Sequence, residues 1–353
     1  MARILNPSLL KELNKRVKTL QQLLEENSLN AYLVSSTPNL LYLTGIETGK
    51  VLITTKHSYL WVKELYFELY ENFLGNDNYP FKVKVYREGV IPHKISRLKL
   101  RKIGVENLPV LSYRRLKKKL SFHLLPLSLV ENMRAVKSAY EIKQLKKAAV
   151  LAKKAMEKAE ELLEIGKRER DIAAEIESFL RKQGSQSPPF SSGMLLAGGA
   201  RGAEIHAYPS SFKLGNGLVV VDLGARINNY YSDMTRTFVV GKVNNNARKK
   251  IEFVRNLEME VIDSLHVGMN ANEIYTYAEK KLENRGYKLY HGLGHGVGLT
   301  IHESPSIAPK SEDILKENMV FTIEPGIYLP GKYGIRFEDM VWLKKNKAIK
   351  LTS

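Results

Sequence analysis

The sequence predicts a mixed α/β (α+β) protein with two domains, residues 1–128 and residues 132–353. Three observations support this class. The chain has 353 residues, which is long enough for two domains with separate cores. In the first domain, short apolar runs alternate with helical patterns. The second domain begins with a long helical segment and then carries two pairs of strands.

The first domain is predicted to begin with a helix at residues 8–26, where leucines recur at helical spacing. Apolar runs bounded by turn residues predict the strands that follow. Strands are expected at 31–34, 51–54, 59–62, 81–86 and 103–105, with a helix at 63–73. Aromatic residues gather in 59–73, and core packing explains them better than contact with a second copy of the chain. No residue of this domain is expected to be catalytic.

The second domain is predicted to begin with a helix at residues 135–163. Ser138 and Glu141, three residues apart, form the pattern of a capping box at its start, and Gly166 ends it. The same helical periodicity predicts the helices that follow. These helices are expected at 170–182, 245–265 and 271–285.

Composition excludes several classes of function. The chain has no cysteine, which excludes disulfides, a thiol nucleophile and a zinc–thiolate site. No segment approaches about 18 uninterrupted apolar residues, and the N-terminus lacks a signal-peptide pattern, so we expect a soluble cytoplasmic protein without membrane contact. The net charge is +18, with basic runs at 97–102 and 114–119. Because these runs contain no aromatic residues for base stacking, we expect a solvated surface without specific nucleic-acid binding.

Residues 218–240 predict the first of two acidic hairpins, because two apolar runs flank a pair of asparagines that favour a turn. A turn centred between Ile227 and Asn228 places Asp222 opposite Asp233. Opposed residues of an antiparallel pair share a face, with Cβ atoms about 5 Å apart. Two carboxylates at such positions repel each other, so a cation is expected between them.

The second acidic hairpin combines strands at 319–324 and 334–341. A turn centred on Gly331 places Glu324 opposite Glu338, and Arg336 shares their face. Burying four carboxylates without a cation would cost too much free energy. The repeated pairing therefore predicts a metal site.

A glycine-rich segment between the hairpins carries histidines. It runs from His291 to Glu303, and its glycines flank His295 on both sides. Four carboxylates with one imidazole suit Mn or Co, with Zn or Fe as alternatives, better than copper or calcium. These ligands exceed the needs of one ion, so we expect two divalent ions sharing bridging carboxylates.

The order of these ligands resembles that of the pita-bread-fold metallopeptidases, which include methionine aminopeptidase, aminopeptidase P, prolidase and creatinase. The resemblance extends to Ser-Asp-Met-Thr-Arg-Thr, Gly-Leu-Gly-His-Gly-Val-Gly-Leu, Thr-Ile-Glu-Pro-Gly-Ile-Tyr and Ile-Arg-Phe-Glu-Asp. It covers nearly the whole chain. It implies a creatinase-like N-terminal domain followed by a pita-bread catalytic domain. A first domain of this type points to the proline-directed branch of the family.

The resemblance also implies metal-binding roles. Asp222 is expected to chelate one ion, and His295 and Glu324 the other. Asp233 and Glu338 are expected to bridge the two ions. Glu324 is additionally expected to take and return the proton of the attacking water.

Further roles follow from the same resemblance. His302 is expected to stabilise the oxyanion, and His206 to contact substrate near the leaving proline. Relatives often have proline immediately before the histidine that corresponds to His206, whereas this chain has Ile205. Arg336 is expected to orient Glu338 and nearby groups, and His291 to be structural.

The expected activity is that of a Xaa-Pro dipeptidase (prolidase) acting on short proline-containing peptides. Two alternatives stay open: aminopeptidase P, which acts on Xaa-Pro-Yaa, and a metal-free binding protein on the same fold. Many prolidase-like relatives have arginine after the string His-Glu-x-Pro, where this chain has Ser306. Longer peptides are therefore expected to be accepted, unless Lys310 or Lys332 replaces that arginine. Relatives with this first domain commonly pair, so we expect a homodimer.

Overall fold

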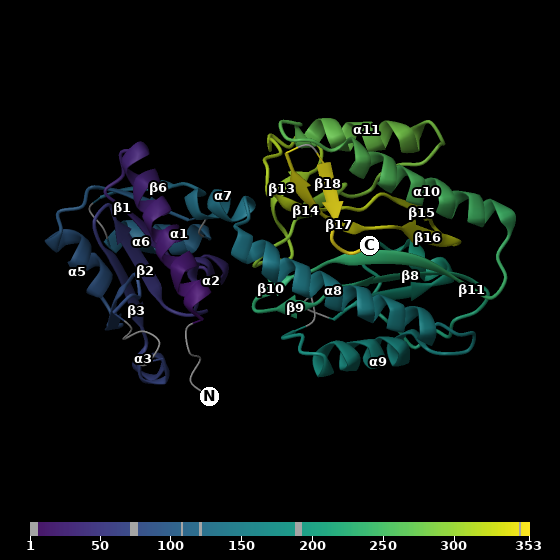
Figure 1. Ribbon diagram of the computed structural model, residues 1–353, viewed down its shortest axis with the longest axis horizontal. Helices are drawn as coiled ribbons and strands as arrows, with labels where there is room; N and C mark the ends of the chain where they lie inside the picture. The colour runs from purple at the N-terminus through teal and green to yellow at the C-terminus, as the bar shows by residue number, and fades with distance from the viewer. Residues whose placement is uncertain (1–5, 71–76, 107–108, 120–121, 188–192, 346) are drawn as a thin grey trace. The chain divides into compact units, whose positions relative to one another are not determined.

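The computed structural model describes residues 6–70, 77–106, 109–119, 122–187, 193–345 and 347–353. The chain divides into two compact units, Met1–Arg134 and Ala135–Ser353 (Figure 1). The division falls near the end of helix α7 (Leu129–Ala135). Arg134, the last residue of the first unit, donates from its Nη1 to Asn39 Oδ1 at 2.9 Å. Within these described residues, no helix combines the length and apolarity needed to span a membrane.

The described part of the first unit contains one sheet with the strand order β4-β3-β2-β1-β5-β6. Its strands are β1 (Ala31–Val34), β2 (Lys50–Thr54), β3 (Ser58–Val62), β4 (Lys82–Val85), β5 (Lys102–Val105) and β6 (His123–Pro126). Its other helices are α1 (Pro7–Glu26), α2 (Thr37–Thr44), α3 (Glu64–Leu69), α5 (Val90–Arg97) and α6 (Val110–Lys119). The expected helix at 63–73 corresponds to α3, and residues 71–76 lie outside the described part. Tyr59 and Trp61 are buried in the core of this unit, as expected for aromatic residues that serve core packing. They are therefore not available as dimer contacts. The homodimer stays a prediction.

The second unit places its strands between two pairs of helices, α8 with α9 and α10 with α11 (Figure 1). The helices are α8 (Ala139–Leu162), α9 (Glu169–Lys182), α10 (Asn245–Ser264) and α11 (Ala271–Glu283). In the described residues, one sheet has the order β11-β8-β7 and another the order β13-β12-β14-β17-β18. Their strands are β7 (Leu195–Gly198), β8 (Gly217–Leu223), β11 (Met234–Val240), β12 (Gly294–Gly296), β13 (Glu303–Ile307), β14 (Val320–Ile323), β17 (Asp339–Lys344) and β18 (Lys347–Lys350).

Two apolar cores fix these helices against the sheets. Apolar residues of α8 and α9 pack with those of β8 and β11, while α10 and α11 pack with β14 and β17. The predicted capping box of α8 is confirmed: Ser138 Oγ accepts from Glu141 N at 3.3 Å, and Glu141 Oε2 accepts from Ser138 N at 3.1 Å. Each helix pair thus packs on one sheet, and the two sheets meet at an isolated bridge between Thr235 and Glu338.

The predicted register of the first acidic hairpin is wrong. Asp222 pairs with Thr235, and Asp233 lies two residues earlier on the same face. The turn is centred between Asn228 and Asn229, because both adopt positive φ (49° and 72°) as a two-residue type I′ turn requires. The short strands β9 (Arg226–Ile227) and β10 (Tyr230–Tyr231) flank this turn.

The predicted register of the second acidic hairpin is confirmed. Ile323 of β14 pairs with Asp339 of β17, and Gly326 pairs with Arg336 in the shorter strands β15 (Gly326–Leu329) and β16 (Tyr333–Arg336). Glu324 and Glu338 occupy the corresponding positions between these two pairings. Both acidic hairpins therefore present their carboxylates at places where a regular strand begins or ends.

Candidate metal centre

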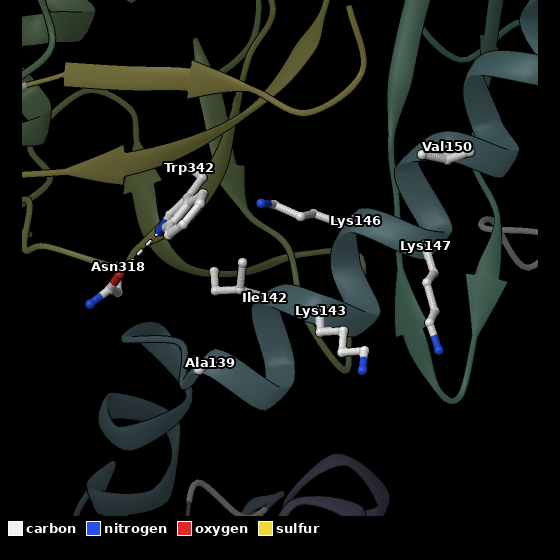
Figure 2. Close-up of a pocket in the computed structure, with 8 residues that line it drawn as sticks. All are labelled: Ala139, Ile142, Lys143, Lys146, Lys147, Val150, Asn318 and Trp342. Atoms are coloured by element: carbon white, nitrogen blue, oxygen red, sulfur yellow. Dashed lines mark hydrogen bonds between the residues drawn. The ribbon is translucent and has the colours of Figure 1, made fainter.

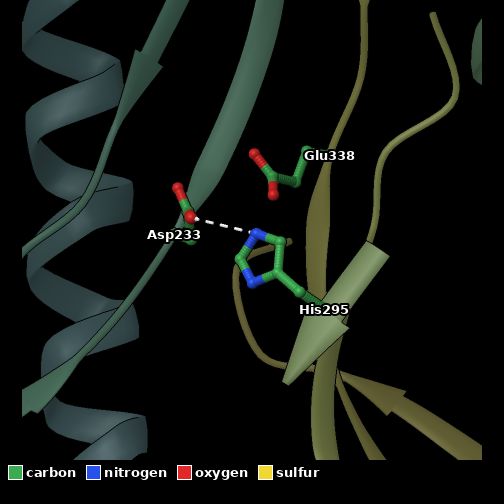
Figure 3. A group of neighbouring side chains, drawn as sticks. All are labelled: Asp233, His295 and Glu338. Atoms are coloured by element: carbon green, nitrogen blue, oxygen red, sulfur yellow. Dashed lines mark ion pairs between the residues drawn. The ribbon is translucent and has the colours of Figure 1, made fainter. Parts of the chain in front are cut away.

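Three of the predicted ligands form a compact cluster at the end of three strands. Asp233 precedes β11, His295 lies in β12 and Glu338 precedes β17, and their side chains point toward one another (Figure 3). One ligand atom from each lies within 4.8 Å of those of the other two. Glu324 joins them, because its Oε1 lies 3.7 Å from His295 Nε2, which is also 3.7 Å from Asp233 Oδ2.

His295 is positioned by the close packing of β12 between its neighbours. A Cβ atom at Gly294 would overlap the carbonyl oxygen of Thr322, so only glycine allows this approach. His295 Nδ1 lies 3.2 Å from Gly296 O. A carbonyl oxygen only accepts hydrogen bonds, so this contact assigns the proton to Nδ1 and leaves the Nε2 lone pair facing the carboxylates.

Asp222 is not one of the three clustered residues and forms an ion pair with Arg336. Arg336 Nη2 donates to Asp222 Oδ2 at 2.6 Å, while Asp222 Oδ1 and Asp233 Oδ1 are buried without a hydrogen-bond partner among the described residues. Buried carboxylate oxygens without a donor are costly unless a cation binds them. The residues present therefore fit a divalent-cation site.

Arg336 reaches Glu338 only indirectly. Its Nε donates to Thr235 Oγ1 at 3.2 Å, and Thr235 Oγ1 donates to Glu338 Oε2 at 2.8 Å. Its Nη1 donates to Ile205 O at 3.2 Å and so fixes the backbone next to His206. The guanidinium thus links Asp222, Thr235 and the segment that carries a predicted substrate contact.

Burial and mutual repulsion change the protonation of the cluster. Burial, followed by the charge of Glu338, raises the pKa values of Asp233 and Glu324 well above their ordinary range. Burial, followed by the charge of Asp222, raises the pKa of Glu338 to about 8. Burial lowers the pKa of His295 to about 3. Without a cation Glu338 therefore retains its proton near neutral pH, and the imidazole of His295 is neutral and free to ligate.

The structure adds two residues to the site. Tyr328 was not identified from the sequence, and His291 was left as structural. Tyr328 Oη accepts from Arg336 Nη1 at 3.0 Å and lies 2.7 Å from His291 Nε2. His291 Nδ1 lies 2.7 Å from Gly292 O, so the proton is on Nδ1 and Tyr328 donates to Nε2. One signal was present in the sequence: Tyr328 shares the strand parity of Glu324 and therefore its face.

His302 and His206 lie exposed beside the cluster. The ring of His302 stands 4.2 Å from that of His295, at 72°. An exposed imidazole next to a buried ligand is in position to meet a substrate from solvent. Among the described residues, neither histidine forms a hydrogen bond or an ion pair with the carboxylates, which distinguishes both from the predicted metal ligands.

Buried carboxylates that converge on a neutral imidazole fit the site of a metal-dependent enzyme. The chain matches metallopeptidase family M24 over residues 143–345 and the creatinase/prolidase N-terminal domain over residues 16–136. It therefore belongs to metallopeptidase family M24. The expected mixed α/β fold, with a creatinase-type first domain and a pita-bread catalytic domain, is confirmed.

Known proteins resemble the chain over nearly its whole length. A Xaa-Pro dipeptidase from Pyrococcus horikoshii is 35% identical, and the match covers 96% of this chain and 97% of that protein. The crystal structure of a prolidase from the same organism superposes with a TM-score of 0.86 at 34% identity, covering 96% and 98% of the two chains. An X-Pro aminopeptidase from Thermotoga maritima superposes with a TM-score of 0.85 at 28% identity, covering 96% and 97%.

Proposed function

We propose that the protein hydrolyses the peptide bond preceding proline in Xaa-Pro dipeptides, using two divalent cations. The observation that carries this proposal is the cluster of Asp233, His295 and Glu338 with Glu324 beside it, in a chain of metallopeptidase family M24. Similarity to proteins named Xaa-Pro dipeptidase and prolidase supports the choice of substrate.

The ligands divide between two positions. Asp233 and Glu338 would be shared by the two cations, because they precede different strands and their side chains converge with that of His295 (Figure 3). Asp222 would complete one position, and His295 with Glu324 the other. We expect Mn or Co, with Zn or Fe as alternatives, because the set is rich in oxygen with one nitrogen. When bound, two such cations supply the Lewis acidity that activates water near neutral pH.

The protein's own groups handle the proton and the substrate. Glu324 would take a proton from water at its carboxylate and return it to the leaving nitrogen. His302 would donate to the developing oxyanion, and His206 would contact the proline side of the substrate. Tyr328 and Arg336 would hold Asp222 and His291 in place.

A direct assay tests this proposal. Protein loaded with Mn²⁺ or Co²⁺ should release proline from Leu-Pro, and protein treated with a chelator should not. Leu-Leu serves as the control, and it should be a poor substrate. Equal proline release before and after chelation would refute the metal-dependent mechanism, and bound metal without any proline release would refute the substrate.

The alternative activity, aminopeptidase P, is favoured by one feature. Ser306 of β13 is exposed and pairs directly with His295 of β12, so the two side chains share a face. A serine hydroxyl cannot form the paired, charge-assisted hydrogen bonds that an arginine gives to a free carboxylate. We therefore propose that the enzyme cleaves Xaa-Pro dipeptides and also accepts Xaa-Pro-Yaa.

Replacing Ser306 with arginine should shift the preference toward dipeptides by about tenfold or more, since a hydrogen bond to a charged group contributes roughly 1.5–3 kcal/mol. Asp313 Oδ2 accepts from Ser306 N at 2.8 Å and could pair with the new guanidinium. The sharper variant therefore combines Ser306→Arg with Asp313→Asn. The measurement is kcat/KM for Leu-Pro and for Leu-Pro-Gly.

Ser178→Arg is the matched control, because Ser178 is an exposed serine on α9. It should leave the ratio of the two kcat/KM values unchanged. An unchanged ratio in the Ser306 variants would show that position 306 does not face the substrate. A preference of the unmodified enzyme for the dipeptide above about a thousandfold, roughly 4 kcal/mol, would show that another cation such as Lys310 or Lys332 already clamps the carboxylate.

A pocket of about 720 Å³ lies apart from these residues and bears on nucleic-acid binding (Figure 2). Lys146 Nζ lies 4.6 Å from the ring centre of Trp342, and Lys143 and Lys147 project from the same helix. Basic and aromatic groups thus meet here, although they are far apart in the sequence. We propose that this surface binds single strands only weakly and without sequence preference.

Three phosphate contacts predict a slope of log K against log salt of about −2 for single strands, or a roughly twentyfold loss from 50 to 200 mM salt. Anisotropy of a labelled oligonucleotide measures this slope. Replacing Lys143, Lys146 and Lys147 with alanine should abolish it, and Lys154→Ala, elsewhere on α8, should not. Micromolar or tighter binding above physiological salt, with sequence preference, would contradict the proposal.

A further inference from the structure

The segment that follows β18 packs against the residues next to Glu338. Thr352 is 1% exposed, and its Oγ1 donates to Asp339 Oδ1 at 2.7 Å while accepting from Met340 N at 2.9 Å. Leu351 N donates to Met340 O at 2.8 Å. A buried threonine therefore satisfies both a backbone donor and a carboxylate immediately after a predicted metal ligand.

Arg236 connects this segment to both metal-binding hairpins. Its Nη1 donates to Thr235 O at 2.9 Å and to Glu338 O at 2.6 Å. Its Nη2 donates to Asp339 Oδ1 at 2.6 Å and to Thr352 O at 3.3 Å. Because a guanidinium is rigid and planar, fixing one side of it against Asp339 and Thr352 fixes the direction of the other side.

Glu338 depends on such support because it belongs to no regular strand. It lies between β16 and β17 and contacts β11 through an isolated bridge to Thr235. One hydrogen bond of this bridge measures 3.1 Å and the other 3.4 Å, beyond the usual range. Arg236 donates to the carbonyl oxygens of Thr235 and Glu338, the two residues of this bridge. It therefore holds the backbone of Glu338 in place and so orients the carboxylate.

Asp339 is itself held from several directions. It is fully buried and forms ion pairs with Arg236 and Lys350. Lys350 Nζ also lies 4.0 Å from Glu258 Oε2. The Thr352 hydroxyl is the neutral member of this group, and its removal leaves every charge in place.

We propose that Thr352 is a positioning residue for Glu338, acting through Asp339 and Arg236, so that the segment after β18 sets the metal affinity of the site. This inference rests on the proposed function only in taking Glu338 as a ligand. Groups that orient metal ligands typically change metal affinity by about 10–100-fold when they are removed.

Thr352→Val keeps the shape and removes the hydroxyl. It should raise the dissociation constant for Mn²⁺ about tenfold, measured by calorimetry on metal-free protein, and lower kcat at limiting Mn²⁺ without changing KM for Leu-Pro. Thr352→Ser retains the hydroxyl and should restore the wild-type Mn²⁺ affinity. The matched control is Thr44→Val in the first unit, because Thr44 is also fully buried and its Oγ1 donates to Leu40 O at 2.7 Å.

Thermal unfolding of the metal-free variants separates positioning from stability. The inference is supported if Thr352→Val binds Mn²⁺ more weakly than Thr44→Val while the two variants lose comparable amounts of melting temperature. Unchanged Mn²⁺ affinity in Thr352→Val would overturn the inference. If that variant does not fold, Arg236→Lys replaces it, with the same expected weakening and the same overturning result. Absence of Mn²⁺ binding by the wild type would instead refute the proposed function.

Discussion

Asp233→Asn and Glu338→Gln should each remove both cations and reduce proline release from Leu-Pro by about three orders of magnitude or more. Metal catalysis contributes several kcal/mol of transition-state stabilisation, which corresponds to a loss of that size. Asp233 has a buried oxygen without a hydrogen-bond partner among the described residues, and Glu338 faces it across the cluster. An amide keeps one oxygen but replaces the second with a group that cannot ligate. Metal content and kcat/KM measure the effect.

Glu169→Gln is the matched control for these variants. Glu169 is fully buried and accepts hydrogen bonds from Gly198 N, Ser210 and Arg201, away from the cluster. Its replacement should cost stability but preserve metal content. Retention of two tightly bound ions and full activity in Asp233→Asn or Glu338→Gln would reject the bridging assignment.

Arg336→Met should destabilise the metal-free protein by about 3–5 kcal/mol, because removing one member of a buried ion pair leaves the other charge uncompensated. Arg336 is 3% exposed, and its Nη2 lies 2.6 Å from Asp222 Oδ2. The loss should be smaller in metal-loaded protein, because the cation then neutralises Asp222. Denaturant unfolding with and without Mn²⁺ measures both values.

Arg336→Lys is the informative companion variant. A lysine retains the charge but not the fork that reaches Asp222, Thr235 and Tyr328 together. It should recover part of the stability lost in Arg336→Met while activity stays reduced. An equal loss of stability with and without Mn²⁺ in Arg336→Met would show that Asp222 is not neutralised by a bound cation.

The second acidic hairpin was predictable because glycine and proline mark its turn, and the register of one strand pair then fixes the next. The first was predicted on the correct face but in the wrong register. Two consecutive asparagines, Asn228 and Asn229, both adopt positive φ and so form the turn themselves. The predicted face of Asp222 and Asp233 is still correct, because a shift of the register by two positions returns a side chain to the same face.

Contacts between distant segments could not be predicted from one sequence. Thr235 and Glu338 are 103 residues apart, and Arg236 and Thr352 are 116 apart. These contacts form only when the two hairpins pack together, and no local sequence pattern predicts that packing. Tyr328 was missed and His291 was left as structural for the same reason, because only the folded chain joins them to Arg336.

The most direct test of a two-ion site is calorimetric titration of the metal-free protein with Mn²⁺ in two buffers of different ionisation enthalpy. We expect two ions per chain and net release of protons at pH 7, because the pKa of Glu338, about 8, is raised by burial and repulsion and the entering cation displaces its proton. Proton release from Glu338 should decline above pH 8, where its carboxylate is already ionised. Binding of fewer than two ions, or binding without proton release at pH 7, would contradict the two-ion centre.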